Sequence, residues 1–174
     1  GRGANQVFNN LITHAGSLST TQRAYGIFAN DALIDLSTPF LLAHNTIVSA
    51  KTDGIRLYGS ASYTHEIINN FIVDPGAEET YATDGIFATE PEDAYIYIGN
   101  GSQVQLDGNV FLSQISTADF VDTTAGNYQL QSTSPAVDSG VNITSPVISL
   151  DLIEAPRVSG SLPDAGAYEF QAIP

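Results

Sequence analysis

The feature that most constrains this chain is a degenerate repeat of two short elements that keep a fixed order. The first element is an Asn followed two residues later by a bulky apolar residue, and it occurs at Asn9-Asn10-Leu11-Ile12, His44-Asn45-Thr46-Ile47, Asn69-Asn70-Phe71-Ile72 and Gly108-Asn109-Val110-Phe111. A second, Gly-Ile element follows the first three copies, at Tyr25-Gly26-Ile27-Phe28, Asp53-Gly54-Ile55-Arg56 and Asp84-Gly85-Ile86-Phe87. Such repetition predicts a solenoid, in which each coil stacks on the one before it.

Short runs with period-two alternation, broken by Gly, Asn and Asp, predict an all-β chain. An antiparallel sandwich is the competing architecture, but it requires tight hairpin signals, and these are scarce in the sequence. We therefore predict a parallel β-helix whose coils occupy residues 1–118. In such a stack an Asn amide can bond to its equivalents about 4.8 Å above and below. The expected ladder consists of Asn10, Asn45, Asn70 and Asn109, with Ile12, Ile47, Ile72 and Phe111 stacked beside it in the core.

The repeat stops after residue 118, where a solenoid needs an atypical end. The sequence continues with Ser134-Pro135-Ala136-Val137-Asp138-Ser139-Gly140, then Ala155-Pro156-Arg157, then Pro163-Asp164-Ala165-Gly166-Ala167-Tyr168-Glu169-Phe170. These segments resemble the choice-of-anchor Q domain, the terminal cap of exported bacterial β-helix proteins, over residues 119–174. The family usually has an Asp-Gly turn shortly before the Arg, where this chain has Ile153-Glu154.

The coils resemble the wider pectate-lyase-like superfamily. Together the two resemblances imply a right-handed parallel β-helix with an irregular C-terminal cap, in which residues 119–174 are the capping region of the same domain. They also imply an extracellular or cell-surface location in a bacterium.

Composition excludes several classes of function. Nineteen acidic and five basic residues among 174 give a net charge of −14, which opposes binding to nucleic acid phosphates. No run of eighteen apolar residues is present, so we expect no insertion into a membrane. Cysteine is absent, which removes disulfides, thiolate metal sites and thiol nucleophiles.

The superfamily resemblance implies that the chain is the C-terminal β-helix portion of a secreted protein that binds or cleaves polysaccharide, as lyases do. The alternative is a structural or adhesive surface module that stacks end to end on a partner subunit. The sequence enters the repeat at once, with Val7 already in an expected strand. We therefore expect the open first coil to adjoin another polypeptide, either upstream residues or a partner chain.

Three residues are candidates for catalysis. Lys51-Thr52-Asp53-Gly54 resembles the Asn-Thr-Asp-Gly motif whose Asp is catalytic in pectin-hydrolysing members of the superfamily. The further Asp-Asp, Gly-His-Gly and Arg-x-Lys elements of those enzymes are absent, so the chain holds no complete catalytic set. Asp53 can equally be a turn residue. Lyases of uronic acid polymers need a base and a positive charge, which Lys51 and Arg56 could supply.

A candidate ligand surface follows from the spacing between the Asn and Gly-Ile elements, which is 16, 9 and 15 residues in successive coils. The short second spacing predicts a notch floored by residues 49–53 between longer loops at 14–24 and 74–83. Strand alternation should turn Ile27, Ile55 and Ile86 inward and Phe28, Arg56 and Phe87 outward. Aromatic rings beside a cation suit a sugar with a carboxylate, although overlying loops or a protein partner could also cover them. The expected ligand-facing residues are Phe28, Lys51, Arg56, Tyr58 and Phe87.

Acidic residues crowd two expected loops, one with Asp74, Glu78, Glu79 and Asp84 and the other with Glu90, Glu92 and Asp93. Calcium is the cation that such oxygen ligands favour, and the first group is the candidate site. Neither loop has an ordered calcium-binding motif, so solvated acidic loops are the alternative. No other cofactor is expected.

Overall fold

The computed structural model describes residues 5–18, 23–30, 39–76, 95–99 and 101–171. Across these residues the chain is all-β, with thirteen strands, β1 to β13, and a short 3-10 helix at Ile115–Thr117. This confirms the prediction that the chain is all-β. None of the described residues belongs to a helix long and apolar enough to cross a membrane.

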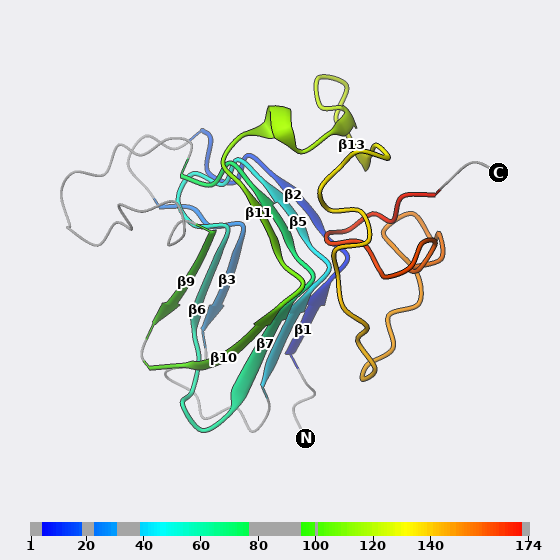
Figure 1. Cartoon of the computed structure of the whole chain (residues 1–174). Helices are drawn as coiled ribbons and strands as arrows, with labels where there is room; N and C mark the ends of the chain where they lie inside the picture. The colour runs from blue at the N-terminus through cyan, green and yellow to red at the C-terminus, as the bar shows by residue number, and fades with distance from the viewer. Residues whose placement is uncertain (1–4, 19–22, 31–38, 77–94, 100, 172–174) are drawn as a thin grey trace.

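Eleven of these thirteen strands form three parallel sheets, and the chain visits the sheets in turn (Figure 1). Sheet A contains β1 (Asn5–Phe8), β4 (Phe40–Ala43), β7 (Thr64–Ile68) and β10 (Gln103–Asp107). Sheet B contains β2 (Leu11–Thr13), β5 (Thr46–Val48), β8 (Phe71–Val73) and β11 (Val110–Leu112). Sheet C contains β3 (Ile27–Asn30), β6 (Ile55–Tyr58) and β9 (Ile96–Gly99). Parallel strands from successive passages therefore stack, as a parallel β-helix requires.

The corner between sheets A and B is a nine-residue unit, which we call the corner unit, and it recurs at 5–13, 40–48, 65–73 and 104–112. Its fifth residue has a positive φ in every copy: 55° at Asn9, 51° at His44, 56° at Asn69 and 58° at Gly108. Gly and Asn adopt this left-handed conformation most readily, and His is also enriched in it. The first repeated element of the sequence therefore marks this corner, where the backbone adopts the left-handed conformation.

The sixth residue of each corner unit is a ladder asparagine. Nδ2 of Asn10 donates to Oδ1 of Asn45, Asn45 donates in the same way to Asn70, and Asn70 to Asn109, each at 2.9 Å. The backbone N–H of each donor residue bonds to the same oxygen, at 2.9 to 3.2 Å. The predicted ladder is confirmed.

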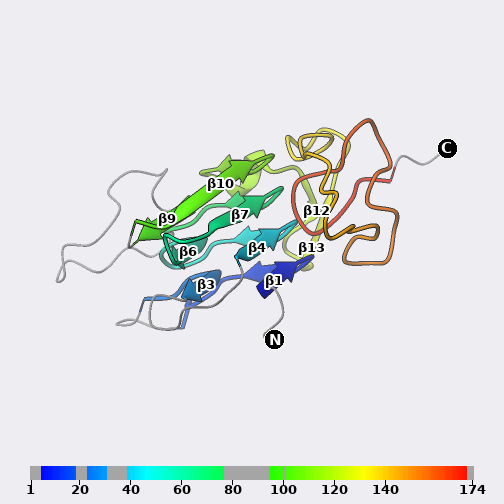
Figure 2. The ribbon, with the colours of Figure 1, turned by 90° about the horizontal axis from the view of Figure 1, so that it is seen from below.

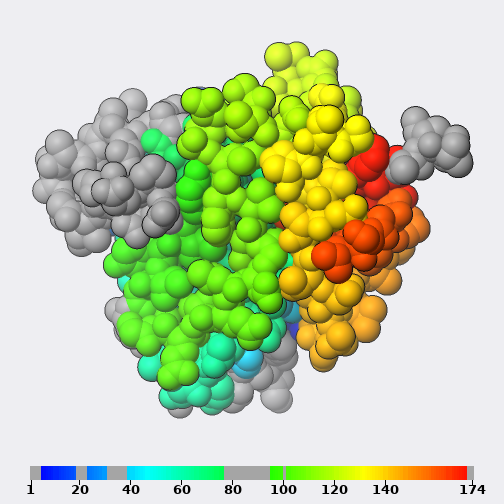
Figure 3. All heavy atoms as spheres, viewed as in Figure 1, coloured from blue at the N-terminus to red at the C-terminus, as the bar shows by residue number. Residues whose placement is uncertain are grey.

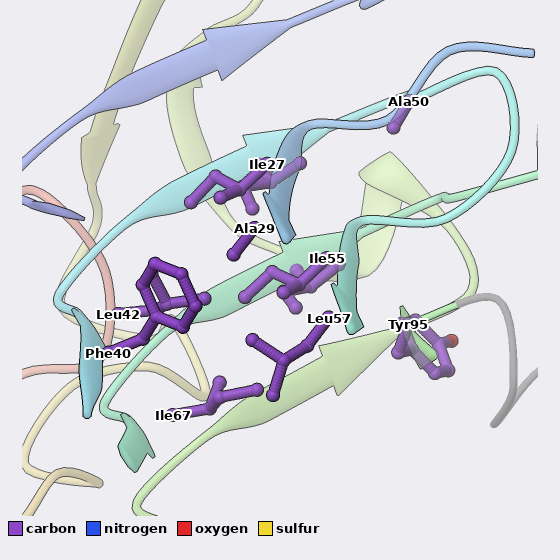
Figure 4. Close-up of a cluster of buried hydrophobic side chains, with 11 residues drawn as sticks. Ile27, Ala29, Phe40, Leu42, Ala50, Ile55, Leu57, Ile67 and Tyr95 are labelled. Carbon is purple, nitrogen blue, oxygen red and sulfur yellow. The ribbon is translucent and has the colours of Figure 1, made fainter. Parts of the chain in front are cut away.

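The main core lies between the three sheets. Its buried side chains include Ile27 above Ile55, and Ala29 above Leu57, from β3 and β6 (Figure 4). The predicted stack beside the ladder is confirmed in its register, because Ile12, Ile47, Ile72 and Phe111 are paired in order. Ile47 and Ile72 are buried in the core, whereas Phe111, in the last coil, is 40% exposed.

The third Gly-Ile element, Gly85-Ile86, lies outside the described residues. The place beside Ile55 in sheet C, where Ile86 was expected, is held by Ile96 of β9. Ile96 is the β-branched residue of an alternating run, Tyr95-Ile96-Tyr97-Ile98, which satisfies the strand pattern over more residues than Gly85-Ile86 does.

Residues 119–171 lie along the side of the coils, against the outer face of sheet B (Figures 1 and 2). They begin with the antiparallel pair β12 (Phe120–Asp122) and β13 (Asn127–Leu130). A second core forms there, in which Val48, Phe71 and Val73 are fully buried. The C-terminal region thus covers a flank of the stack, while the coil made by residues 95–112 faces the viewer in Figure 3.

Arg157 fastens this region to the corner units. Its guanidinium donates to the carbonyls of Gly166 and Ala167 at 3.0 and 3.1 Å and to Oδ1 of Asn9 at 2.6 Å. Nearby, Glu154 has a φ of 65°, the left-handed conformation that a glycine would adopt more easily. The turn is held by the Asp151 carboxylate, which accepts the N–H groups of Ile153 and Ala155.

His44 joins the same corner to the C-terminal region. Its Nδ1 lies 3.2 Å from the carbonyl oxygen of Asp164 and its Nε2 lies 3.1 Å from Nδ2 of Asn69. Because a carbonyl accepts and an amide nitrogen donates, Nδ1 carries the proton and the ring is neutral. Burial, together with the Arg157 charge, lowers the pKa of His44 to about 3.

Candidate functional site

The outer face of sheet C gathers aromatic side chains around one arginine. Alternation along β6 sends Ile55 and Leu57 into the core and leaves Arg56 on the outer face. The neighbouring strands place Phe28 and Tyr97 in the same register as Arg56. We call the group of Tyr25, Phe28, Arg56, Tyr58 and Tyr97 the aromatic cluster.

Arg56 lies at the centre of the aromatic cluster, and its side chain is only 3% exposed. The guanidinium carbon lies 4.1 Å from the ring centroid of Tyr97, 5.0 Å from that of Tyr25 and 5.7 Å from that of Tyr58. Nε donates to the Tyr58 hydroxyl and Nη1 to the Tyr25 hydroxyl, each at 3.2 Å. The cation thus holds tyrosines by both their faces and their hydroxyl groups.

Asp53 compensates the charge of Arg56. One of its carboxylate oxygens lies 2.9 Å from Nη1. Burial lowers the pKa of Arg56, but the Tyr58 hydroxyl and the Asp53 carboxylate outweigh it and leave the pKa raised. Nη2 is buried and has no hydrogen-bond partner in the described part of the chain. A spare donor therefore remains beneath the rings.

The rings form a continuous row across the three strands. Centroid distances are 5.5 Å between Tyr25 and Phe28, 6.1 Å between Phe28 and Tyr58, and 5.7 Å between Tyr58 and Tyr97. Phe28 is 53% exposed, and the three tyrosines are half-buried. Such a row offers apolar ring faces together with hydroxyl groups, which is the combination that amphipathic ligands use.

Lys51 and Asp53 do not floor an open notch. Residues 49–53 are all buried, and Lys51 is only 1% exposed. The backbone N–H groups of Lys51 and Thr52 donate to the carbonyls of Ala15 and Ala24, and Gly76 N–H donates to Ala50 and Thr52 from the other side. The prediction of a notch is therefore wrong, because the flanking segments close onto the short one through backbone bonds.

The structure brings together four of the sequence-predicted site residues: Phe28, Asp53, Arg56 and Tyr58. Phe87, which was also predicted for this face, lies outside the described residues. The position beside Arg56 where it was expected is held by Tyr97 of β9.

Sequence reasoning missed Tyr25 and Tyr97 as members of the aromatic cluster. A signal for Tyr97 existed in the alternation of Ile96-Tyr97-Ile98, which turns the tyrosine to the face opposite the isoleucines. Tyr95 precedes β9 and is buried in the main core. Tyr25 precedes its strand, so no alternation rule places its ring.

Asp74 is the single described member of the predicted calcium group, since Glu78, Glu79 and Asp84 lie outside the described residues, as do Glu90, Glu92 and Asp93. Its carboxylate accepts the Ser49 hydroxyl at 2.9 Å. Burial raises the pKa of Tyr95, and the negative charge of the Asp74 carboxylate raises it further. Among the described residues, no three His, Asp or Glu side chains gather as metal ligands would.

A pocket of about 340 Å³ opens in the C-terminal region. Its lining is mostly apolar and includes Ile143, Val147, Ile148 and Val158, with His44 and Arg157 at its inner side. Both polar side chains are already engaged with Asp164, Asn69, Asn9, Gly166 and Ala167. The aromatic cluster is therefore the better candidate for a functional site.

Comparison of this chain with protein-family models, with curated proteins and with solved structures finds no match. The function has to be argued from the geometry alone.

Proposed function

We propose that this chain is a right-handed parallel β-helix portion of a secreted or surface-located bacterial protein, and that its aromatic cluster binds an acidic polysaccharide. The row of rings runs along the direction in which the coils stack, so successive rings suit successive parts of an extended chain of sugars. The apolar faces of sugar rings pack on aromatic rings, and the tyrosine hydroxyls can bond to sugar hydroxyls.

The observation that carries this proposal is the exposed Phe28 ring beside tyrosines that surround a buried guanidinium. Arg56 has a donor at Nη2 that no described residue uses, but this atom is buried, so a sugar carboxylate could accept from it only after the tyrosine rings above it move aside. Asp53 and Arg56 compensate each other at 2.9 Å, which favours binding over cleavage, because neither is left as an unpaired base or charge.

The test measures binding of oligogalacturonides and of matched neutral oligosaccharides by isothermal titration calorimetry. Phe28→Ala and Tyr97→Ala should each weaken binding of the acidic ligand roughly tenfold, the effect of about 1.4 kcal/mol. Phe8→Ala removes a ring that is 38% exposed on sheet A, so it is the matched control and should bind like the wild type.

Arg56→Lys keeps the charge but loses the planar fork, and we expect it to reduce the preference for acidic over neutral ligand. Circular dichroism melting of each variant separates a lost ligand contact from a lost fold. Binding that is unchanged in both Phe28→Ala and Tyr97→Ala, with both proteins folded, would rule out the aromatic cluster as the site.

A further inference from the structure

The two ends of the coil stack expose the same structural unit. In the described part of the chain, β1 and β2 pair only with β4 and β5, and β10 and β11 pair only with β7 and β8. The first corner unit, 5–13, and the last, 104–112, therefore each leave one edge unpaired. They have the same length and the same left-handed residue at the corner.

Neither edge carries the features with which proteins protect an exposed strand. Edge strands are commonly blunted by Lys, Pro or inward charges. Residues 5–13 contain no charged residue and no proline, and residues 104–112 contain only Asp107. Both edges also expose large apolar side chains, at 38% for Phe8, 49% for Leu106 and 40% for Phe111. In a chain with a net charge of −14, these nearly uncharged, apolar edges are suited to pairing with another polypeptide.

The asparagine ladder gives the two ends opposite hydrogen-bonding character. Every rung donates from the earlier coil to the later one. Among the described residues, Oδ1 of Asn10 therefore accepts nothing, while the backbone N–H of Asn109 has no acceptor and its Nδ2 bonds to the Ile67 carbonyl alone. An Asn10 placed after Asn109 would accept from it as Asn109 accepts from Asn70, where both distances are 2.9 Å.

The existing register indicates which side chains would meet. Gln6, Leu41, Glu66 and Gln105 form one column through sheet A, so the next residue in that column would be another Gln6. By the same register Leu106 would meet Val7, Val110 would meet Leu11, and Phe111 would meet Ile12. In these columns apolar residues meet apolar residues and amides meet amides. The same register is less well matched elsewhere, because Asp107 would meet Phe8 and Val104 would meet Asn5.

From these observations we infer that a second copy of this chain adds head to tail, its residues 5–13 stacking on residues 104–112 of the first. Sheet C ends one strand earlier, at β9, so the contact is made by sheets A and B. The contact joins different surfaces of the two copies, and each added copy continues the stacking direction of the coils, so the contact propagates into a filament instead of closing into a ring. The negative charge of each copy opposes the contact, and salt should therefore promote it.

The test follows the sedimentation velocity of the whole chain as a function of concentration and salt. Gln6 and Gln105 are both exposed, so their substitution leaves the core intact. The double variant Gln6→Lys with Gln105→Lys places like charges opposite each other. It should associate roughly 2- to 5-fold more weakly than the wild type at low salt, the effect of about 0.4 to 1 kcal/mol for one cross-strand pair.

The double variant Gln6→Lys with Gln105→Glu places opposite charges at the same contact and should associate at least as strongly as the wild type. A mixture of the two corresponding single variants, Gln6→Lys and Gln105→Glu, should associate more than either alone. Val121→Lys is the control for net charge, because it changes the charge as Gln105→Lys does, but at a residue of β12 that is 47% exposed. It should associate equally with the Gln6→Lys and Gln105→Glu single variants.

Three results would overturn the inference: a wild-type chain that stays monomeric at high concentration and high salt, equal association of the like-charge and swapped-charge variants, or closed dimers in place of filaments in electron micrographs. Because none of these substitutions touches the aromatic cluster, the test of carbohydrate binding can fail or succeed independently of the test of filament formation.

Discussion

At the scale of single residues, the ladder asparagines connect sequence to fold most directly. Asn70 is fully buried and uses its whole amide, since Oδ1 accepts from Asn45 while Nδ2 donates to Asn109 and to the Leu42 carbonyl. The sequence predicted these roles because the amide that supplies both donor and acceptor recurs at a fixed place in the repeat. It could not predict all the partners of Arg56, since Tyr97 lies outside the repeated elements and Tyr25 precedes its strand, where no alternation rule places a ring.

The ladder predicts a gradient of stability along the coils. Asn70→Ala leaves buried groups of Asn45 and Asn109 without partners, and we expect it to lower the free energy of unfolding by about 3 kcal/mol. Asn10→Ala, at the half-buried first rung, should cost only about 1 kcal/mol. Urea denaturation of both variants measures the difference, and equal losses would show that the ladder does not stabilise the interior coils.

At the scale of elements, the packing of the C-terminal region against sheet B had a signal in the sequence. The runs Ile47-Val48 and Phe71-Ile72-Val73 are apolar at successive positions, which is typical of strands buried on both faces. The outer residues of these runs, Val48, Phe71 and Val73, contact the C-terminal region. What covers them could not be predicted, because residues 119–171 have little regular structure whose periodicity would reveal a matching face.

Glu169 makes the attachment of this element depend on pH. Its carboxylate accepts the N–H groups of Ser159 and Asp164, and burial raises its pKa from 4.5 to about 7. A folded-state pKa above the unfolded value means that the contribution to stability is complete below pH 4.5 and is lost as the pH rises through about 7.

We therefore expect Glu169→Gln to gain stability relative to the wild type as the pH is raised across that interval. The gain is measured as the difference in melting temperature at each pH. Any fixed cost of the lost acceptor is the same at every pH and does not affect this slope. Glu154→Gln, at an exposed residue, is the control, and a slope as large in that variant would exclude Glu169 as the cause.

At the scale of the whole molecule, the coils and the C-terminal region share a core and do not form separable parts. Removal of residues 119–174 would expose Val48, Phe71 and Val73, each now fully buried, to water. A contiguous apolar patch of this kind promotes aggregation. We expect residues 1–118 alone to be insoluble, and expression as a soluble monomer would contradict this.

A matched variant of the truncated chain tests the cause. Replacing Val48, Phe71 and Val73 by Thr puts β-branched residues with a polar hydroxyl group on the outer face. The variant should recover soluble protein, as measured by size-exclusion chromatography. Failure of this variant, together with solubility of the full chain, would indicate that the C-terminal region acts on the coils in a way other than by covering sheet B.

The corner unit also has a consequence for how such a chain can change its length in evolution. Along the stack each unit pairs only with the units before and after it, so deletion or duplication of a whole coil would leave the asparagine ladder continuous. The contacts that a deleted unit makes to the C-terminal region, such as that of His44 to Asp164, would be lost with it. Loss of residues 40–64 would bring Asn10 against Asn70 in the bond that Asn10 now makes to Asn45. The intervals between rungs are already 35, 25 and 39 residues, so the segments that link the corners tolerate insertion while the corners do not. Variation among descendants of this chain should therefore occur in whole coils and in linking loops, with the nine-residue corner unchanged in length.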